Sequence, residues 1–367
     1  MKVLHLCSDF YNMYGNLMRR EVEAGIDLSV FQFISRQKRI VFREPYLKTV
    51  QCFNEPDRYI FTLKEKKVYA ALHREYDLQS FDFVHAHTIF SNGYIAWKIK
   101  QEYNIPYIVA VVNTDINIFF RRRPYLKPIG LAVLAEAERI IFHSPAYLEF
   151  ILKKYIPARL REGIRAKSQI IPIGIEKIFH DQVKPHVLPA NPRIKLLTVS
   201  NINRNKNHLT VCTAAEKLIK MGCSVEYTVI GKPLEKKTLA MISKKPYVKY
   251  FPYMTQQELI DQYRAHDIFV MPSIYETFGM VFAEAMSQGL PIIYSQGQGF
   301  DGQFANGLAG YSVRATDSEA IAQAILVILG NYEEISRRCT ELVKKFDWDN
   351  ITQQYIALYR ILERKKE

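Results

Sequence analysis

Short apolar runs alternate with helical segments along almost the whole chain, and this alternation restricts the possible folds more than any other feature. In the first half, runs typical of buried strands lie at residues 2–7, 81–87, 107–112, 139–144 and 168–175. Amphipathic segments such as YIAWKIKQEY at 94–103 lie between them. Strands that alternate with helices usually pair in parallel, so this half is expected to form an α/β domain.

The same rhythm begins again after HDQVKPHVLPANPR at residues 180–193, a segment with three prolines that is typical of a linker. Strands are expected at 194–200, 225–231, 248–253, 267–273 and 290–295, and helices at 208–221, 256–265, 279–288 and 317–329. A length of 367 residues also favours two domains.

We therefore predict an α/β protein with two doubly wound, Rossmann-like domains, at residues 1–180 and 194–345, joined by a linker at 181–193. Ligands of such sheets bind at the carboxyl ends of the strands, so an interdomain cleft is the expected site. Residues 346–367 should form a final helix. The sequence does not say which domain this helix covers, and packing back on the first domain is one alternative.

The cysteines and the N-terminus favour a cytoplasmic protein. The five cysteines are scattered and lack CxxC spacing, which argues against a disulfide framework or a zinc site. The N-terminal run MKVLHLCSDF does not resemble a signal peptide, because His5 and Asp9 interrupt it. No uncharged apolar stretch approaches the roughly 18 residues of a membrane span.

The positive charge is concentrated in the first half of the chain. Of a net charge of +13, residues 1–185 hold 28 Lys and Arg against 19 Asp and Glu, and the remaining residues hold 22 against 18. The first half is thus the one expected to meet an anionic partner, either a phosphate or the inner face of a membrane. Solubility alone is the alternative explanation.

The segment SIYETFGMVFAEAMSQGLPIIY at 273–294 places Glu276 before a predicted helix and Glu284 within it. The start of a helix has unpaired N–H groups that attract phosphate, and Gly279 allows a ligand to approach the backbone. Glu284 can accept hydrogen bonds from vicinal ribose hydroxyls, and Glu276 from a second polyol. The segment therefore indicates a nucleotide sugar as ligand, with a capped helix and two exposed glutamates as the alternative.

The seven residues between these glutamates resemble the E-x7-E motif of retaining glycosyltransferases of the GT-B fold, especially glycosyltransferase family 4, the glycosyl transferases group 1. Other segments follow the order and spacing of that family: SDF…YG (8–15), DFVHAH (82–87), IPIGIEKIF (171–179), NRNKN (203–207), VIG (229–231), DIFVMPS (267–273) and EAMSQGLPII (284–293). The resemblance covers nearly the whole chain, and the set is specific where single segments are not.

The resemblance implies a role for each matching residue. Glu284 would bind the ribose, and Glu276 would contact hydroxyls of the donor sugar. The remaining donor contacts would come from the backbone N–H groups of Phe278, Gly279 and Met280, from Lys206 at the diphosphate, and from Gly15 in the loop after the first strand. Lys206 also follows a predicted strand, where a fixed cation could lower the barrier to diphosphate departure by about 3 kcal/mol. A solvated lysine is the alternative.

The implied activity is transfer of a sugar from a nucleotide-diphosphate sugar to a glycan or lipid-linked acceptor, with retention of anomeric configuration. Surface polysaccharide biosynthesis is the implied setting, and no metal or other cofactor is expected. Two other activities use the same cleft: a GT-B sugar-nucleotide epimerase, and a nucleotide-sugar binder without catalysis.

Two positions depart from the family pattern. Asn201 stands where the family often has an arginine, and Arg204 is the candidate for the missing cation. Asn113 stands where a histidine commonly faces the donor sugar. Asparagine forms hydrogen bonds but does not transfer protons. Asn113 is therefore compatible with a front-face displacement in which the diphosphate oxygen takes the acceptor proton.

Several residues of the first half are candidates for the acceptor side. They are His85, His87, Arg19 and Arg20. The two histidines share a face of a predicted strand. A metal site would need a third ligand that the sequence does not locate, and two core histidines are the alternative.

Two further patterns invite a functional interpretation. Arg121, Arg122 and Arg123 lie among aromatic residues, which suits an anionic membrane or a lipid-phosphate acceptor; a solvated basic loop is the alternative. Nucleic acid is not expected, because no recognised motif accompanies the charge. The DxD pattern at 347–349 precedes the final helix, where a helix cap by Asp349 or Asn350 is expected instead of a metal site.

Overall fold

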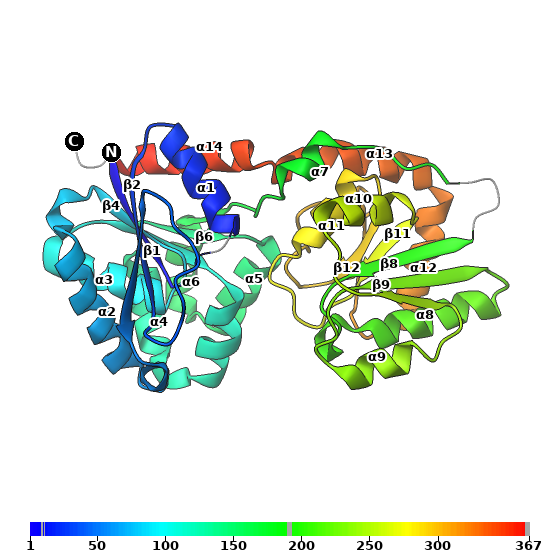
Figure 1. Ribbon diagram of the computed structural model, residues 1–367, viewed down its shortest axis with the longest axis horizontal. Coiled ribbons are helices and arrows are strands. Elements are labelled where there is room, and N and C mark those ends of the chain that lie inside the picture. The colour runs from blue at the N-terminus through cyan, green and yellow to red at the C-terminus, as the bar shows by residue number, and fades with distance from the viewer. Residues whose placement is uncertain (9, 11, 189–192, 364–367) are drawn as a thin grey trace. The chain divides into compact units, whose positions relative to one another are not determined.

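The computed structural model describes residues 1–8, 10, 12–188 and 193–363, and the chain divides into two compact units (Figure 1). The N-terminal unit comprises Met1–His143, Leu148–Ile171 and Ile351–Glu367. The C-terminal unit comprises Ser144–Tyr147 and Pro172–Asn350. Asp9 of the SDF segment, residues 189–192 of the predicted linker and residues 364–367 lie outside the described part.

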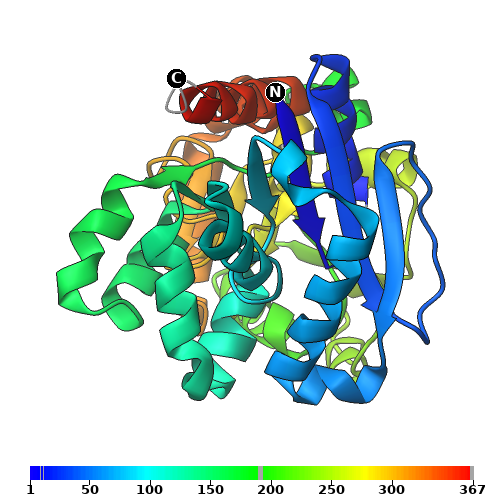
Figure 2. The ribbon, with the colours of Figure 1, turned by 90° about the vertical axis from the view of Figure 1, so that its left-hand side faces the viewer.

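The N-terminal unit contains a parallel sheet of seven strands in the order β3-β2-β1-β4-β5-β6-β7 (Figure 2). Its strands are β1 (Lys2–Cys7), β2 (Asp27–Ser35), β3 (Leu47–Phe53), β4 (Phe83–Ala86), β5 (Tyr107–Val111), β6 (Arg139–Phe142) and β7 (Ser168–Ile170). The strand order reverses between β1 and β4, which makes their carboxyl ends the expected ligand position.

The helices of this unit connect successive strands. They are α1 (Asn12–Glu23), α2 (Phe61–Glu75), α3 (Ser91–Tyr103), α4 (Lys127–Glu136), α5 (Pro145–Lys154) and α6 (Ala158–Ala166). Shorter turns lie at η1 (Glu55–Tyr59), η2 (Leu78–Ser80), η3 (Asp115–Phe120) and η4 (Pro124–Leu126). The central strands are apolar and buried, as expected for a sheet with helices on both faces.

The C-terminal unit contains a parallel sheet of six strands in the order β10-β9-β8-β11-β12-β13. Its strands are β8 (Ile194–Val199), β9 (Val225–Ile230), β10 (Val248–Phe251), β11 (Ile268–Met271), β12 (Ile292–Ser295) and β13 (Gly310–Val313). Its helices are α7 (Lys177–Asp181), α8 (His208–Lys220), α9 (Lys236–Ile242), α10 (Gln256–Arg264), α11 (Met280–Ser287), α12 (Ser318–Gly330) and α13 (Tyr332–Leu342), with short turns η5 (Arg204–Lys206) and η6 (Val343–Phe346). Here the strand order reverses between β8 and β11.

The predicted α/β fold with two Rossmann-like sheets is confirmed, but three strands were not among the predicted ones: β2, β3 and β13. The segment at 168–175 was predicted as one strand, and it pairs only as far as Ile170. Pro172 cannot donate a backbone hydrogen bond, which prevents the ladder from continuing.

The described part of the predicted linker lies on the C-terminal unit. The N–H of Lys184 donates to the carbonyl of Ser287 over 3.1 Å, and the N–H of His186 donates to Ser336 Oγ over 2.8 Å. The change from the N-terminal to the C-terminal unit therefore occurs near residue 172, before the proline-rich segment.

The final helix, α14 (Trp348–Glu363), belongs to the N-terminal unit from Ile351 onward and lies beside β1 (red and dark blue in Figure 2). The prediction that Asp349 or Asn350 caps it was wrong. The cap is Asp347, whose Oδ1 accepts hydrogen bonds from the N–H groups of Asp349 (2.8 Å) and Asn350 (3.2 Å). Asp347 precedes the first helical residue, the position from which a side chain reaches these groups.

Among the described residues, none of the helices combines the length and the apolar character needed to span a bilayer.

Candidate active site

Two loops of the C-terminal unit meet where the strand order reverses. One follows β8 and runs from Asn201 to Asn207, and the other follows β11 and leads into α11. Because β8 and β11 are paired neighbours in a parallel sheet, both loops leave the same edge of that sheet. The residues on these two loops that the sequence assigns to a nucleotide sugar are therefore brought together by topology.

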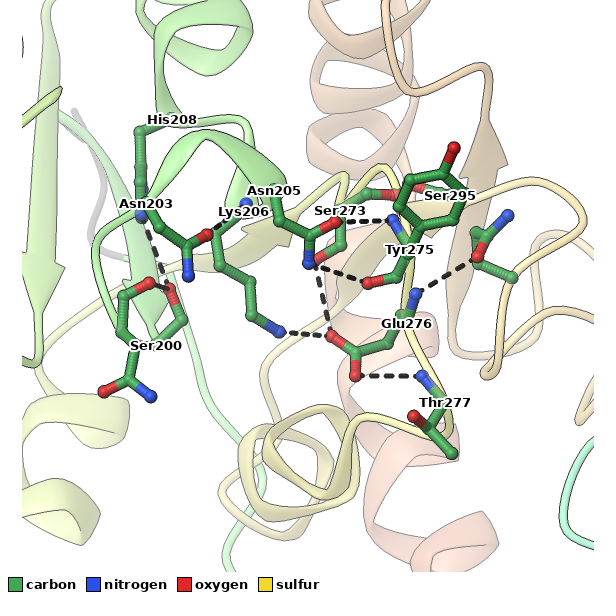
Figure 3. Close-up of polar contacts among 12 residues, drawn as sticks. Ser200, Asn203, Asn205, Lys206, His208, Ser273, Tyr275, Glu276, Thr277 and Ser295 are labelled. Atoms are coloured by element: carbon green, nitrogen blue, oxygen red, sulfur yellow. Dashed lines mark hydrogen bonds and ion pairs between the residues drawn. The ribbon is translucent and has the colours of Figure 1, made fainter. Parts of the chain in front are cut away.

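Asn205 holds the two loops to each other (Figure 3). Its Nδ2 donates to the carbonyl of Tyr275, and its Oδ1 accepts from the N–H of the same residue, both over 2.9 Å. Asn207 adds a hydrogen bond from its Nδ2 to the carbonyl of Pro272 over 3.0 Å and has a left-handed backbone with φ of +59°. Asparagine tolerates that conformation better than most residues, which accounts for its use at this tight turn.

Lys206 and Glu276 form an ion pair across these loops, with Nζ 2.5 Å from Oε2 (Figure 3). Their side chains are 19% and 14% exposed. Ser273 Oγ donates to Glu276 Oε2 over 3.3 Å, and the N–H of Thr277 donates to Oε1 over 3.2 Å. The pair is therefore fixed in position and only partly solvated, unlike the solvated lysine and exposed glutamate that were the alternatives.

Gly279 is the residue immediately before α11 and has a φ of +83°. A Cβ at this position would lie 2.6 Å from the ring of Phe282, so a larger residue would both strain the backbone and collide. Phe278 is 1% exposed as a whole residue, so the structure buries both its ring and its backbone, which was predicted to contact the donor. This geometry leaves the start of α11 beside Glu276, where N–H groups and the helix dipole favour an anion.

Glu284 lies on α11 and accepts a hydrogen bond from the hydroxyl of Tyr263 over 3.0 Å. Burial is the main cause that raises the pKa of Glu284 to about 7; the hydrogen bond from Tyr263 opposes this shift, and the nearby charge of Glu176 adds to it. The carboxyl group is thus partly protonated near neutral pH. A ligand that donates hydrogen bonds to it would favour the charged form.

Met280 is the first residue of α11, and the other predicted donor residues of this unit lie on the loop that carries Lys206. Asn201 and Arg204 are exposed, and the N–H of Arg204 donates to Glu235 Oε2 over 2.9 Å. Asn203 accepts the N–H of Lys206 on its Oδ1 over 3.1 Å and thereby orders the turn. Arg204 lies two residues before Lys206, and its role as a second cation stays a prediction.

The remaining predicted residues lie in the N-terminal unit. Asn113 is half-buried after β5, and its Oδ1 accepts a hydrogen bond from Asn117 Nδ2. Gly15 was predicted to lie in a loop, and that placement was wrong: it lies in the first turns of α1, which begins at Asn12. A helix starting so soon after β1 leaves only a short connection.

The two arginines on α1 already have contacts of their own. Arg19 is exposed, with Nη2 3.7 Å from Glu44 Oε1. Arg20 donates from Nη1 to the carbonyl of Asn16 over 3.2 Å. Neither of these contacts involves a residue that the sequence assigned to the site.

His85 and His87 are buried, at 0% and 3% exposure, and the structure adds a third histidine that the sequence interpretation missed. His5 Nδ1 lies 3.0 Å from His87 Nε2, and His5 is the residue opposite His85 in the pairing of β1 with β4. Only this register, which the sequence does not give, could have revealed the cluster. The ligand atoms of these histidines lie within 4.8 Å of one another, so within the part of the chain that the structure describes they form the group that could hold a metal ion.

The surroundings of the histidine cluster are those of a closed polar core. Tyr359 of α14 bridges His85 Nδ1 and Glu21 Oε1, each over 2.7 Å. Burial lowers the pKa of all three histidines and raises that of Glu21 to about 8, which keeps the cluster uncharged near neutral pH. Since His85 has no exposed surface, the position offers little for an acceptor to contact.

Comparisons with known proteins show which family and which fold this chain resembles. Residues 181–346 match the family model described as glycosyl transferases group 1. The chain is 24% identical over 312 residues to a D-inositol 3-phosphate glycosyltransferase of Corynebacterium urealyticum, covering 78% of this chain and 73% of that protein. It spans 66%, about two thirds, of the length of a relative of the same name from Geodermatophilus obscurus.

Solved structures share the fold at lower identity. Sucrose-phosphate synthase from Thermosynechococcus elongatus superposes with a TM-score of 0.77 at 19% identity, over 100% of both chains. Anabaena HepE, in complex with UDP-glucose, superposes with a TM-score of 0.68 at 13% identity, over 98% of this chain and 99% of that one. The chain has the GT-B fold, and its residues 181–346 match the family model of the glycosyl transferases group 1.

Proposed function

We propose that the protein transfers a sugar from a nucleotide-diphosphate sugar to a hydroxyl group of a glycan or lipid-linked acceptor, with retention of anomeric configuration. The observation that carries this proposal is the Lys206–Glu276 ion pair beside the start of α11. It joins the cation, the carboxylate and the helix N-terminus that a diphosphate linked to a sugar would need. The UDP-glucose bound to the related HepE fold supports the same ligand class.

In this proposal the bound donor replaces the contact between Lys206 and Glu276 with contacts to the donor itself. The diphosphate takes the ammonium group of Lys206 and the N–H groups at the start of α11, and Glu276 turns to hydroxyls of the sugar. The side chains are only partly exposed, so these contacts are stronger than they would be in open water. Glu284 accepts the ribose hydroxyls one and a half turns further along α11.

The chemical step is a displacement on one face of the sugar. The bond between the anomeric carbon and the diphosphate oxygen breaks, and the acceptor oxygen bonds to the same face. The acceptor proton passes to the leaving diphosphate oxygen, so no protein base is required. Asn113 then orients the sugar by hydrogen bonding, a role that an uncharged amide can fill. Lys206 and α11 offset the charge that develops on the diphosphate, and no metal is part of the proposal.

Product analysis tests the proposal. The protein is incubated with a set of nucleotide sugars and candidate acceptors in the presence of EDTA, and the products are identified by NMR. Free nucleoside diphosphate and an α-linked product from an α-linked donor are expected. An altered sugar nucleotide would indicate an epimerase, and binding without any product would indicate a silent binder. Inverted product, or activity that needs an added divalent ion, would contradict the proposed mechanism.

A further inference from the structure

The N-terminal unit contains a cavity of about 280 Å³ with a strongly basic lining. Four cationic side chains line it: Lys38, Arg58, Lys64 and Arg123. Four hydroxyl side chains also line it: Ser8, Thr88, Ser91 and Thr114. None of the lining residues that the structure describes carries a carboxylate. A cavity with this composition is suited to an anion with several oxygen atoms.

The cavity lies where a doubly wound sheet binds its ligands. Ser8 directly follows β1, Thr88 lies two residues beyond β4, and Thr114 lies three residues beyond β5. These strands are consecutive neighbours in the sheet, and the strand order reverses between β1 and β4. The basic lining therefore surrounds the carboxyl ends of the strands at the reversal point. The position of the cavity in the sheet thus indicates a ligand site independently of its charged lining.

Two of the cations are held by neighbouring carboxylates. Lys64 is 10% exposed, with Nζ 2.9 Å from Glu65 Oε1 and 3.0 Å from Ser91 Oγ. Arg58 Nε lies 2.7 Å from Glu55 Oε2. These pairs fix the side chains before any ligand arrives, which reduces the conformational entropy lost on binding.

Arg123 is held in a different way. Its Nη1 donates to the carbonyl of Arg58 over 3.2 Å, and its guanidinium lies 5.7 Å from the ring centre of Phe119. The Arg58 carbonyl and the Phe119 ring position the guanidinium without neutralising it. Because a guanidinium presents parallel N–H donors, Arg123 suits a phosphate group better than a single-point anion.

One wall of the cavity is apolar and is formed by Phe61, Ile118 and Phe119. The cavity volume lies near the lower end of the roughly 300–1,000 Å³ that is typical of small-molecule sites. The lining thus suits a ligand with a compact carbon skeleton and one anionic group rather than a long uncharged chain.

We propose that this cavity binds a phosphate group carried by the acceptor, so that the protein glycosylates phosphorylated acceptors. The assignment of the ligand as acceptor rests on the proposed function, whereas the anion site rests on the cavity alone. Thr114 adjoins Asn113 in the chain, so an acceptor anchored here is held next to the residue proposed to orient the sugar. The phosphate belongs either to a soluble sugar phosphate or to a lipid-linked phosphate.

The first experiment measures the anion site without requiring catalysis. Inorganic phosphate is titrated into the intact protein by calorimetry, in a Lys206→Ala background that weakens the proposed donor site. Arg123→Gln and Thr114→Val should each weaken phosphate binding, the former by roughly ten- to a hundredfold, which is the scale of a charge-assisted hydrogen bond. Lys66→Gln is the matched control, since it removes one exposed cation of α2 outside the cavity. Unchanged phosphate affinity in Arg123→Gln and Thr114→Val would overturn the site.

The second experiment tests the acceptor. Transfer is compared between a phosphorylated acceptor and its dephosphorylated form, both as a soluble sugar phosphate and as a lipid-linked phosphate in vesicles. At least a tenfold preference for one phosphorylated form is expected, and Arg123→Gln should abolish the preference while Lys66→Gln keeps it. Equal rates with and without phosphate would overturn the acceptor assignment. Phosphate binding in the first experiment together with no transfer of any kind would contradict the proposed function instead, so the two failures are distinguishable.

Discussion

Lys206 and Glu276 form an ion pair with each other in the structure, and without a ligand this pair is what compensates their two charges. Each would otherwise hold a partly buried charge without a partner, which is unfavourable. The pair therefore keeps both groups in place until a ligand supplies new partners.

Lys206→Ala should lower kcat more than it lowers affinity for the free nucleoside. The ammonium group acts on the diphosphate, and its effect grows as the diphosphate leaves. A loss of about a hundredfold in kcat is expected, on the scale of about 3 kcal/mol. Steady-state kinetics and calorimetry with the nucleoside measure the two quantities, and Lys220→Ala at the exposed end of α8 is the control. A variant with full kcat would place the cation elsewhere, with Arg204 the first to test.

Glu284→Gln should remove a pH dependence from both stability and donor binding. The folded pKa of about 7 lies above the usual 4.5, so stability from this group is present below pH 4.5 and is lost as pH rises through 7. The variant should thus be more stable than the parent at pH 8, by about 1–3 kcal/mol, and equal to it at pH 4. Urea unfolding at the two pH values measures this difference.

Donor affinity should respond to pH in the opposite direction. Ribose hydroxyls donate to the charged carboxylate, so the parent should bind donor more tightly at pH 8 than at pH 6. Glu284→Gln should bind more weakly at pH 8, by about 1–3 kcal/mol, and should show little change with pH. Calorimetry across this range gives the result. The same affinity at pH 6 and pH 8 in the parent would remove Glu284 from the ribose.

At the scale of elements, helix α14 reaches the polar core of the N-terminal unit with the hydroxyl group of Tyr359. Tyr359→Phe should lower the free energy of unfolding by about 2–4 kcal/mol, because it leaves His85 and Glu21 buried without their partner. Urea unfolding measures the change, and Tyr253→Phe, which removes an exposed hydroxyl, is the control. Equal stability of Tyr359→Phe and the parent would show that the hydroxyl is not needed in this core.

The elements that the sequence predicted well are those with a strong local signal. Helices α8, α10, α11 and α12 have the expected positions within one or two residues, because each repeats apolar side chains at helical spacing between strand-like runs. Strand β3 was not predicted, since its polar residues Lys48, Thr49 and Gln51 interrupt an apolar pattern at the edge of the sheet. An edge strand obtains its stability from one neighbour, which local composition does not reveal.

In the candidate site, too, individual residues could be predicted from the sequence, whereas contacts between distant residues could not. Glu276, Glu284 and Lys206 could be chosen as candidates from the sequence, because the resemblance to the family marks them and each is expected near a strand end or a helix start. The partnership of Lys206 with Glu276 could not, since 70 residues separate them and only the pairing of β8 with β11 brings their loops together. The place of His5 in the histidine cluster could not be predicted for the same reason, because the register between β1 and β4 determines that it lies beside His85.

At the scale of the whole molecule, the positive charge of the N-terminal half should be measurable as membrane affinity. The protein is expected to bind anionic vesicles at low salt, with Arg121 and Arg122 contributing because both are exposed. Binding should fall as salt rises, since exposed charges are screened over about 8 Å at physiological ionic strength. Vesicle flotation of the double variant Arg121→Gln/Arg122→Gln measures their contribution, separately from Arg123 in the cavity.

The control for this measurement removes two adjacent exposed cations from the C-terminal unit, Lys236 and Lys237, by substitution with glutamine. Net charge then falls equally in both variants. Equal loss of binding would mean that total charge matters and that the arginine segment has no special role. No binding at low salt by the parent would contradict the membrane surface altogether.

The position of α14 also sets an order of events during synthesis. The ribosome releases β1 and β4 early, yet the helix that covers His5 and His85 emerges only after the entire C-terminal unit. The C-terminal unit is thus able to complete its fold first, although domains usually fold in the order in which they are made. Until α14 arrives, the nascent N-terminal sheet keeps an open polar face. A ribosome that stalls before residue 348 holds a chain whose later half is nearly complete and whose earlier half still awaits its cover, so this nascent chain should be a preferred client of chaperones.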